Sequence, residues 1–159
     1  MQRRTRNRLC IWVIFLGLMN YLSYGFSYQY IAGDARNGDI IETTTEDGTT
    51  VFQYRVRGHH ITQGPEGSFS EVSRGTWIYS YIHSITIWPT HAAILVSMFV
   101  LARADIIATM KEDSWLQGGT FVTVCVTIIV LLAGSSTLWF LLDFVKKLYE
   151  IEAGTPAVG

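Results

Sequence analysis

The longest apolar run in the chain extends from Trp77 to Arg103 and strongly limits what the chain can fold into. The hydrocarbon core of a bilayer is about 30 Å thick and needs about 20 helical residues to cross it, so this run predicts a transmembrane helix. Pro89 and the imidazoles of His83 and His91 lie within it. Because ionisable groups are costly in lipid, we expect both histidines to face protein, water or a cofactor.

Two further apolar runs, at 9–26 and 121–145, reach or nearly reach the length needed to span a membrane. At 159 residues, with 49% hydrophobic and 16% charged residues, the chain is more apolar than a soluble domain of its size. The predicted fold is therefore an all-α integral membrane protein with three transmembrane helices, at 9–26, 77–103 and 121–145. Little of the chain remains for a soluble catalytic domain, and we predict neither catalytic residues nor an enzyme.

The distribution of basic residues predicts the orientation in the membrane. Residues 1–8 contain four arginines, which by the positive-inside rule keep this end in the cytoplasm. The first apolar run continues without a small-residue cleavage site, so it is expected to remain as an anchor. The intervening segments are then an extracytoplasmic segment at 27–76, a cytoplasmic loop at 104–120 and an extracytoplasmic tail at 146–159. A bacterial inner membrane is the predicted location.

The segment 27–76 contains a predicted β-hairpin at 39–57, with strands at 39–45 and 51–57. Asp47-Gly48 between the strands is a strong hairpin signal. An isolated hairpin is marginally stable in water, so its apolar face needs a cover, and a partner protein or the membrane surface is expected to supply it better than the short flanking loops. Residues 70–75 are expected to lead into the second helix. The hairpin residues predicted to form an interface are Phe52, Tyr54 and Val56.

A polar stripe on the second helix repeats at helical spacing and consists of Ser80, His83, Ser84, Ile87 and His91. Since lipid is a poor neighbour for such a stripe, we expect it to face the first helix, the third helix or another subunit. Ser80 and Ser84 are therefore predicted to lie at an interface.

The third helix offers a counterpart to this stripe near its midpoint, where small residues allow close approach of helix backbones. His91 lies at a similar depth, and the simplest interpretation is that it hydrogen-bonds there or to a backbone carbonyl. The small and hydroxyl residues predicted to form this interface are Gly134, Ser135 and Ser136.

The alternative interpretation gives His91 or His83 a cofactor, since a neutral imidazole can ligate a haem iron or a chlorophyll-type magnesium, or bind a quinone. Bis-histidine haem normally takes ligands from two helices, and the other two apolar runs contain no histidine. A haem or (bacterio)chlorophyll would therefore be shared with a partner, and we favour no cofactor. His59 and His60 would point to opposite faces of a strand, so no metal site is predicted there.

These features predict a non-catalytic accessory or stabilising subunit of a larger membrane protein complex, of the respiratory or photosynthetic electron-transport kind. The predicted partners are other integral membrane subunits and lipid. The net charge of −1 and the lack of a long basic stripe argue against nucleic acid. Two alternatives remain open: a haem- or chlorophyll-binding subunit that uses a histidine of the second helix, and a small oligomeric transporter or channel component.

Overall fold

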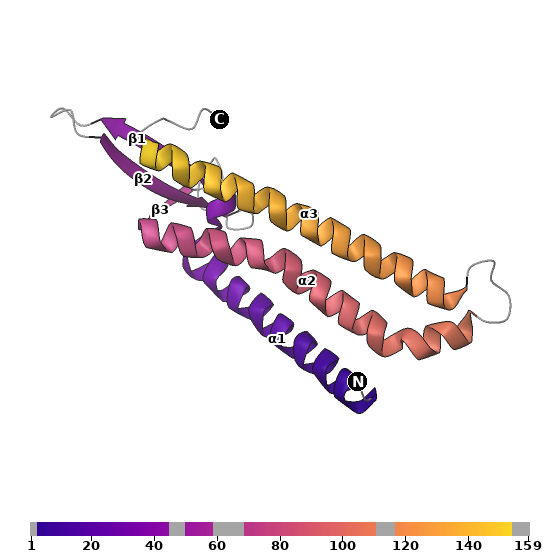
Figure 1. The fold of residues 1–159 in the computed structure, drawn as a ribbon. Helices are drawn as coiled ribbons and strands as arrows, with labels where there is room; N and C mark the ends of the chain where they lie inside the picture. The colour runs from indigo at the N-terminus through magenta and orange to yellow at the C-terminus, as the bar shows by residue number, and fades with distance from the viewer. Residues whose placement is uncertain (1–2, 45–49, 59–68, 111–116, 154–159) are drawn as a thin grey trace. The chain divides into compact units, whose positions relative to one another are not determined.

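A computed structural model describes residues 3–44, 50–58, 69–110 and 117–153 of the chain. Its main elements are three long helices, α1 (Arg3–Tyr30), α2 (Arg74–Thr109) and α3 (Gly118–Ala153). Each is long and apolar enough to cross a membrane. A small sheet separates α1 from α2 in the sequence (Figure 1). The predicted arrangement of three long apolar helices with a short β segment after the first is confirmed.

The helices extend beyond the apolar runs that predicted them. α2 begins at Arg74, where the hydroxyl of Ser73 accepts a hydrogen bond from the backbone N–H of Thr76 at 3.2 Å and caps the first turn. It ends at Thr109, so residues 104–109 are helical, although they were predicted as loop. Hydropathy reports only the part of a helix suited to lipid, whereas backbone hydrogen bonding continues through the polar residues beyond it.

The sheet has three antiparallel strands in the order β1 (Ile40–Thr44), β2 (Thr50–Arg57) and β3 (Phe69–Val72). β1 and β2 correspond to the two predicted strands of the hairpin, and the predicted turn at 46–49 lies outside the described residues. β3 was predicted only as the approach to the second helix. Its four residues carry little strand signal of their own and are strand-like because they pair with the free edge of β2.

Contacts divide the chain into two compact units, which we describe separately. The helical unit comprises Met1–Tyr21 and Ile87–Leu138, and the sheet unit comprises Leu22–Thr86 and Trp139–Gly159. Each of the three helices contributes residues to both units.

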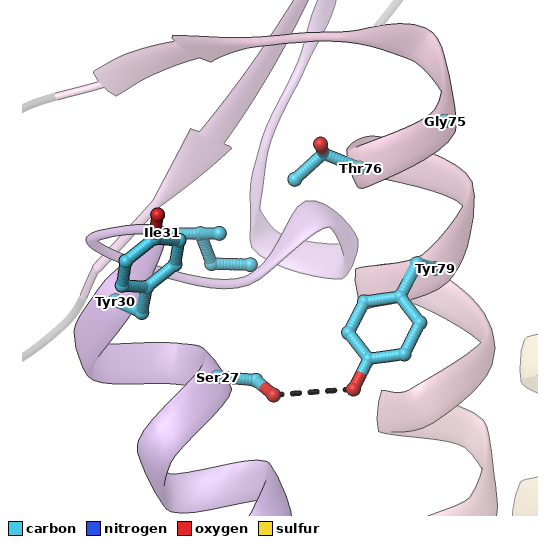
Figure 2. Close-up of a pocket in the computed structure, with 6 residues that line it drawn as sticks. All are labelled: Ser27, Tyr30, Ile31, Gly75, Thr76 and Tyr79. Carbon is cyan, nitrogen blue, oxygen red and sulfur yellow. Dashed lines mark hydrogen bonds between the residues drawn. The ribbon is translucent and has the colours of Figure 1, made fainter.

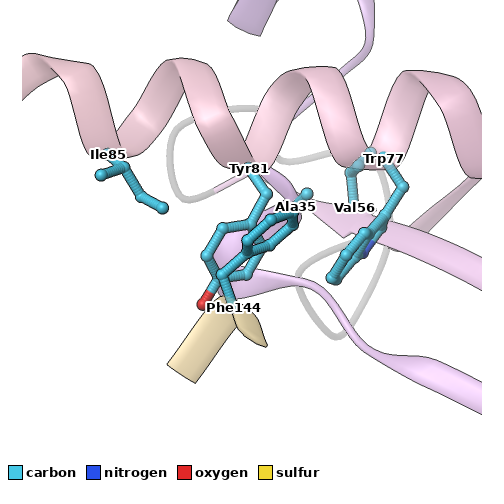
Figure 3. Packing of buried hydrophobic residues seen from close by; sticks show 6 residues of the cluster. All are labelled: Ala35, Val56, Trp77, Tyr81, Ile85 and Phe144. Atoms are coloured by element: carbon cyan, nitrogen blue, oxygen red, sulfur yellow. The ribbon is translucent and has the colours of Figure 1, made fainter. Parts of the chain in front are cut away.

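The core of the sheet unit lies on the apolar face of the sheet. Val56 and Trp77 are fully buried in it, and the ring of Trp77 stacks on that of Phe144 with centroids 6.2 Å apart (Figure 3). The ring of Tyr54 packs against Trp77 at 6.1 Å. This face was predicted to need a partner or the membrane as its cover, but α2 and α3 of the same chain cover it. The buried cluster consists of Ala35, Val56, Trp77, Tyr81, Ile85 and Phe144.

Close packing of α1 against α2 defines the helical unit. A Cβ atom added to Gly17 would lie 2.6 Å from Cγ1 of Ile94, so a larger residue would force the Ile94 side chain or the helices to shift. One turn further along, the side-chain amide of Asn20 donates a hydrogen bond to the hydroxyl of Thr90 at 2.9 Å. Polar bonds between helices of this kind add to the van der Waals packing that holds transmembrane helices together.

Candidate functional site

The most highly organised polar group of the sheet unit is the carboxylate of Asp34, just after α1. Ala32 and Gly33 reverse the chain here with φ angles of 59° and 148°. The backbone N–H of Asp34 then donates to the carbonyl of Arg57 at 3.0 Å, which attaches the segment to β2. The side chain accepts the backbone N–H of Arg36 at 3.1 Å and caps a short 3-10 helix, Ala35–Asn37.

Three hydroxyl groups complete the shell around this carboxylate, which is only 2% exposed. Tyr24 donates at 3.0 Å, Ser80 donates at 3.4 Å, and Ser84 donates through a shorter hydrogen bond. A buried carboxylate is costly unless hydrogen-bond donors surround it, and bonds to a charged acceptor are among the stronger ones. With four donors already bound, Asp34 is placed to hold α1 and α2 against the sheet.

Ser80 and Ser84, predicted to lie at an interface, thus face the segment that follows α1. The hydroxyl of Ser80 also accepts the backbone N–H of Ala35 at 3.1 Å, and the hydroxyl oxygens of Ser84 and Tyr24 lie 3.3 Å apart. Asp34 was not among the site residues predicted from the sequence. The available signal was its position after glycine and two residues before Arg36, a spacing at which an aspartate commonly bonds the backbone.

His83 is half-buried between two tyrosine rings of the sheet unit. Its ring makes edge contacts with Tyr24 and Tyr79, both with centroids 5.5 Å apart. The hydroxyl of Tyr79 is 3.2 Å from that of Ser27. Both residues line an open cleft of about 340 Å³ (Figure 2). The cleft is lined by Ser27, Tyr30, Ile31, Gly75, Thr76 and Tyr79.

His91 belongs to the helical unit and is exposed. Its Nδ1 is hydrogen-bonded to the hydroxyl of Tyr21 on α1, and the two rings meet edge to face at 6.0 Å. Its partner within the chain is therefore a residue of α1 rather than Ser135 or Ser136 of α3. The sequence contained both members of this pair, but nothing in it relates their positions along the two helices.

Within the described part of the chain, no other helix packs against the small residues near the midpoint of α3. Gly134 and Ser135 are exposed, and a Cβ atom added to Gly134 would meet nothing within 4 Å. The hydroxyl of Ser135 donates to the carbonyl of Leu132 on its own helix at 3.1 Å, and Ser136 is half-buried. These residues thus leave an open notch on the surface of α3.

Among the hairpin residues predicted to form an interface, Val56 and Tyr54 instead pack inside the chain. Val56 is fully buried, and Tyr54 lies against the buried cluster. Phe52 is half-buried and lies outside that cluster, so it retains exposed ring surface.

A second polar cluster joins the C-terminal part of α3 to α2. Tyr81 donates a short hydrogen bond to Asp143, and Lys147 lies 3.4 Å from the same carboxylate. Asp143 and Lys147 are four residues apart, so this ion pair lies along one face of α3. The guanidinium of Arg36 lies 4.4 Å from the ring centroid of Phe140, which adds a contact between α3 and the segment after α1.

The described residues bring together no group of three or more histidine, cysteine, aspartate or glutamate side chains that could hold a metal ion. His59 and His60 lie outside those residues. In comparisons with protein-family models, curated proteins and solved structures, none matched this chain.

Proposed function

We propose that this chain is a non-catalytic accessory or stabilising subunit of a larger membrane complex, of the respiratory or photosynthetic kind. The observation that supports this most is how little the helices bury within the chain. In their most apolar stretches, only 11%, 6% and 11% of the residues of α1, α2 and α3 are buried. Most residues of these stretches thus keep surface that lipid or neighbouring subunits can cover.

The polar groups of the sheet unit support the same role. The oxygens of Asp34 accept four hydrogen bonds from within the chain, and Tyr81 and Lys147 both contact Asp143. These contacts attach an ordered extramembrane sheet to the ends of the helices. A rigid sheet on a membrane anchor is suited to docking on the extracytoplasmic face of a core complex, with the helices filling a groove at its edge.

The test compares native membranes with and without the chain on blue native gels. Deletion is expected to shift one large complex to lower mass and reduce its amount, while turnover per remaining complex stays unchanged. Re-expression of the wild-type chain should restore the mass. If the chain migrates alone and no complex changes on deletion, the accessory role is wrong. Loss of turnover per complex would instead assign it a catalytic role.

A second candidate function, axial ligation of a haem iron or a chlorophyll-type magnesium by His91, rests on one observation. The Nδ1 of His91 is bonded to Tyr21, which leaves Nε2 as the nitrogen that could meet a metal. Histidine ligands commonly have their other ring nitrogen held in this way. Ligation needs the proton on Nδ1, donated to the Tyr21 oxygen. An absorption spectrum of purified protein tests it: a Soret or chlorin band that shifts in His91→Ala supports ligation, and no such band rules it out.

A further inference from the structure

We propose that copies of this chain associate side by side in the membrane, with the imidazole of His91 on one copy seated at Gly134 and Ser135 of the next. This goes beyond the accessory role and does not depend on it. All the residues concerned belong to the helical unit.

His91 lies deep within the apolar part of α2. It lies about 18 Å along α2 from Arg103, the nearest charged residue of that helix, at ~1.5 Å per residue. That distance places the ring well inside a hydrocarbon core about 30 Å thick. Exposed polar groups at this depth are unfavourable in lipid, since no water is present to bond them. An exposed His91 therefore calls for a neighbour that supplies a hydrogen bond.

In the proposed contact, His91 presents a hydrogen-bond donor, the N–H of Nε2, to its neighbour. A phenolic O–H is a stronger donor than an imidazole N–H, and a neutral imidazole nitrogen is a good acceptor. The proposed contact uses the tautomer in which Tyr21 donates to Nδ1 and the proton of the neutral ring sits on Nε2, the reverse of the one that metal ligation would need. No described residue bonds Nε2 within the chain. The neighbour must accordingly offer an acceptor.

The helix α3 offers such an acceptor beside an open space for the imidazole ring. The proton of the Ser135 hydroxyl is used by the carbonyl of Leu132, which leaves the lone pairs of its oxygen to accept. Gly134 forms a notch, because nothing lies within 4 Å of the place where its Cβ would be. The flanking Leu131 and Leu138 are 65% and 56% exposed, so the notch interrupts an apolar ridge. Small residues permit this kind of close approach between transmembrane helices.

The donor on α2 and the acceptor on α3 lie at matching depths. α2 and α3 meet near Gly118, whose Cβ position is 2.8 Å from Cα of Ile107. His91 precedes Ile107 by as many residues as Gly134 follows Gly118, about 24 Å along each helix. Two copies with the same orientation in the membrane would therefore bring His91 and Gly134 to one level. The two surfaces differ, so the contact is heterologous and generates a ring or a row.

The experiment uses the full chain in phosphatidylcholine–phosphatidylglycerol liposomes, with donor and acceptor dyes on C-terminal tags. Wild type is expected to show energy transfer that persists as lipid dilutes the protein. His91→Ala and Gly134→Leu should each reduce transfer to the level of a non-interacting membrane protein, and Tyr21→Phe should lower it. Because the space around Gly134 is open, the leucine leaves the fold of the single chain intact. Gly25→Leu, at a second glycine with nothing within 4 Å, is the control and should retain transfer.

Mixing the two defective variants gives the decisive result. A His91→Ala copy keeps its Gly134 surface and a Gly134→Leu copy keeps its His91 surface, so transfer should return between the two kinds of copy. If wild type shows no transfer, if neither variant lowers it, or if the mixture fails to recover it, the proposal is wrong. Because no other subunit is present, these outcomes are separate from those of the native-membrane experiment.

Discussion

The hydroxyl of Ser84 on α2 donates a hydrogen bond to the buried carboxylate of Asp34, 50 residues earlier in the chain. The bond joins the helix to the segment that enters the sheet. Ser80, one turn before Ser84, binds the other oxygen of the same carboxylate at 3.4 Å. Two serines one helical turn apart thus bind one carboxylate, and these hydrogen bonds attach α2 to the segment that enters the sheet.

Replacing Asp34 by alanine should destabilise the sheet unit, because it leaves buried hydroxyl and N–H donors without an acceptor. The expected loss is about 2–4 kcal/mol for Asp34→Ala and about 1–2 kcal/mol for Ser84→Ala, which leaves three donors in place. Denaturant unfolding in detergent micelles, followed by circular dichroism, measures both. Thr123→Ala, which removes an exposed hydroxyl that donates to the carbonyl of Gly119 on its own helix, is the control. Equal effects of Ser84→Ala and Thr123→Ala would contradict the assigned role of Asp34.

Trp77→Ala should be among the most destabilising substitutions in the chain. Trp77 is 0% exposed, and its ring contacts those of Tyr54, Tyr81 and Phe144. Truncation of a buried tryptophan commonly costs about 3–5 kcal/mol. Trp12→Ala, at a residue that is 61% exposed, provides the comparison and should change the melting temperature little. Similar melting temperatures for the two variants would show that the sheet core is not packed as described.

Gly17→Leu should separate α1 from α2, because its Cβ alone would lie 2.6 Å from a carbon of Ile94. Overpacking of this kind costs about 1–3 kcal/mol. Gly25→Leu, where nothing lies within 4 Å, should be neutral or gain up to about 1 kcal/mol from better helix propensity. Unfolding of both variants in the same detergent tests the difference. A Gly17 variant as stable as the Gly25 variant would disprove the close approach.

The proposed orientation, with the N-terminus in the cytoplasm, can be tested with single cysteines in a background lacking Cys10 and Cys125. Thr43→Cys on β1 should react with a membrane-impermeant thiol reagent in intact bacterial cells, since this exposed residue would lie outside the cytoplasm. Asp105→Cys near the other end of α2 is also exposed and should react only after permeabilisation. The opposite labelling pattern would reverse the orientation.

The three helices could be predicted from the sequence because a membrane-spanning helix is a local property. Length and apolarity within one run, such as that from Trp77 to Arg103, suffice to predict it. The strands β1 and β2 were also predictable, since Asp-Gly between two alternating segments is a local signal. β3 was not, because its four residues depend on pairing with β2, and a pairing partner is a tertiary fact.

The polar stripe of α2 shows what helical spacing in the sequence can predict and what only tertiary contacts decide. Helical spacing was enough to place Ser80, Ser84 and His91 on a face unsuited to lipid. Only the tertiary structure decided what each of them meets: Asp34 for the two serines, and Tyr21 for His91. Periodicity defines a direction around one helix axis, whereas a contact also depends on how a distant segment is placed and turned. The sequence alone therefore determined the three apolar helices, and the fold chose their polar partners.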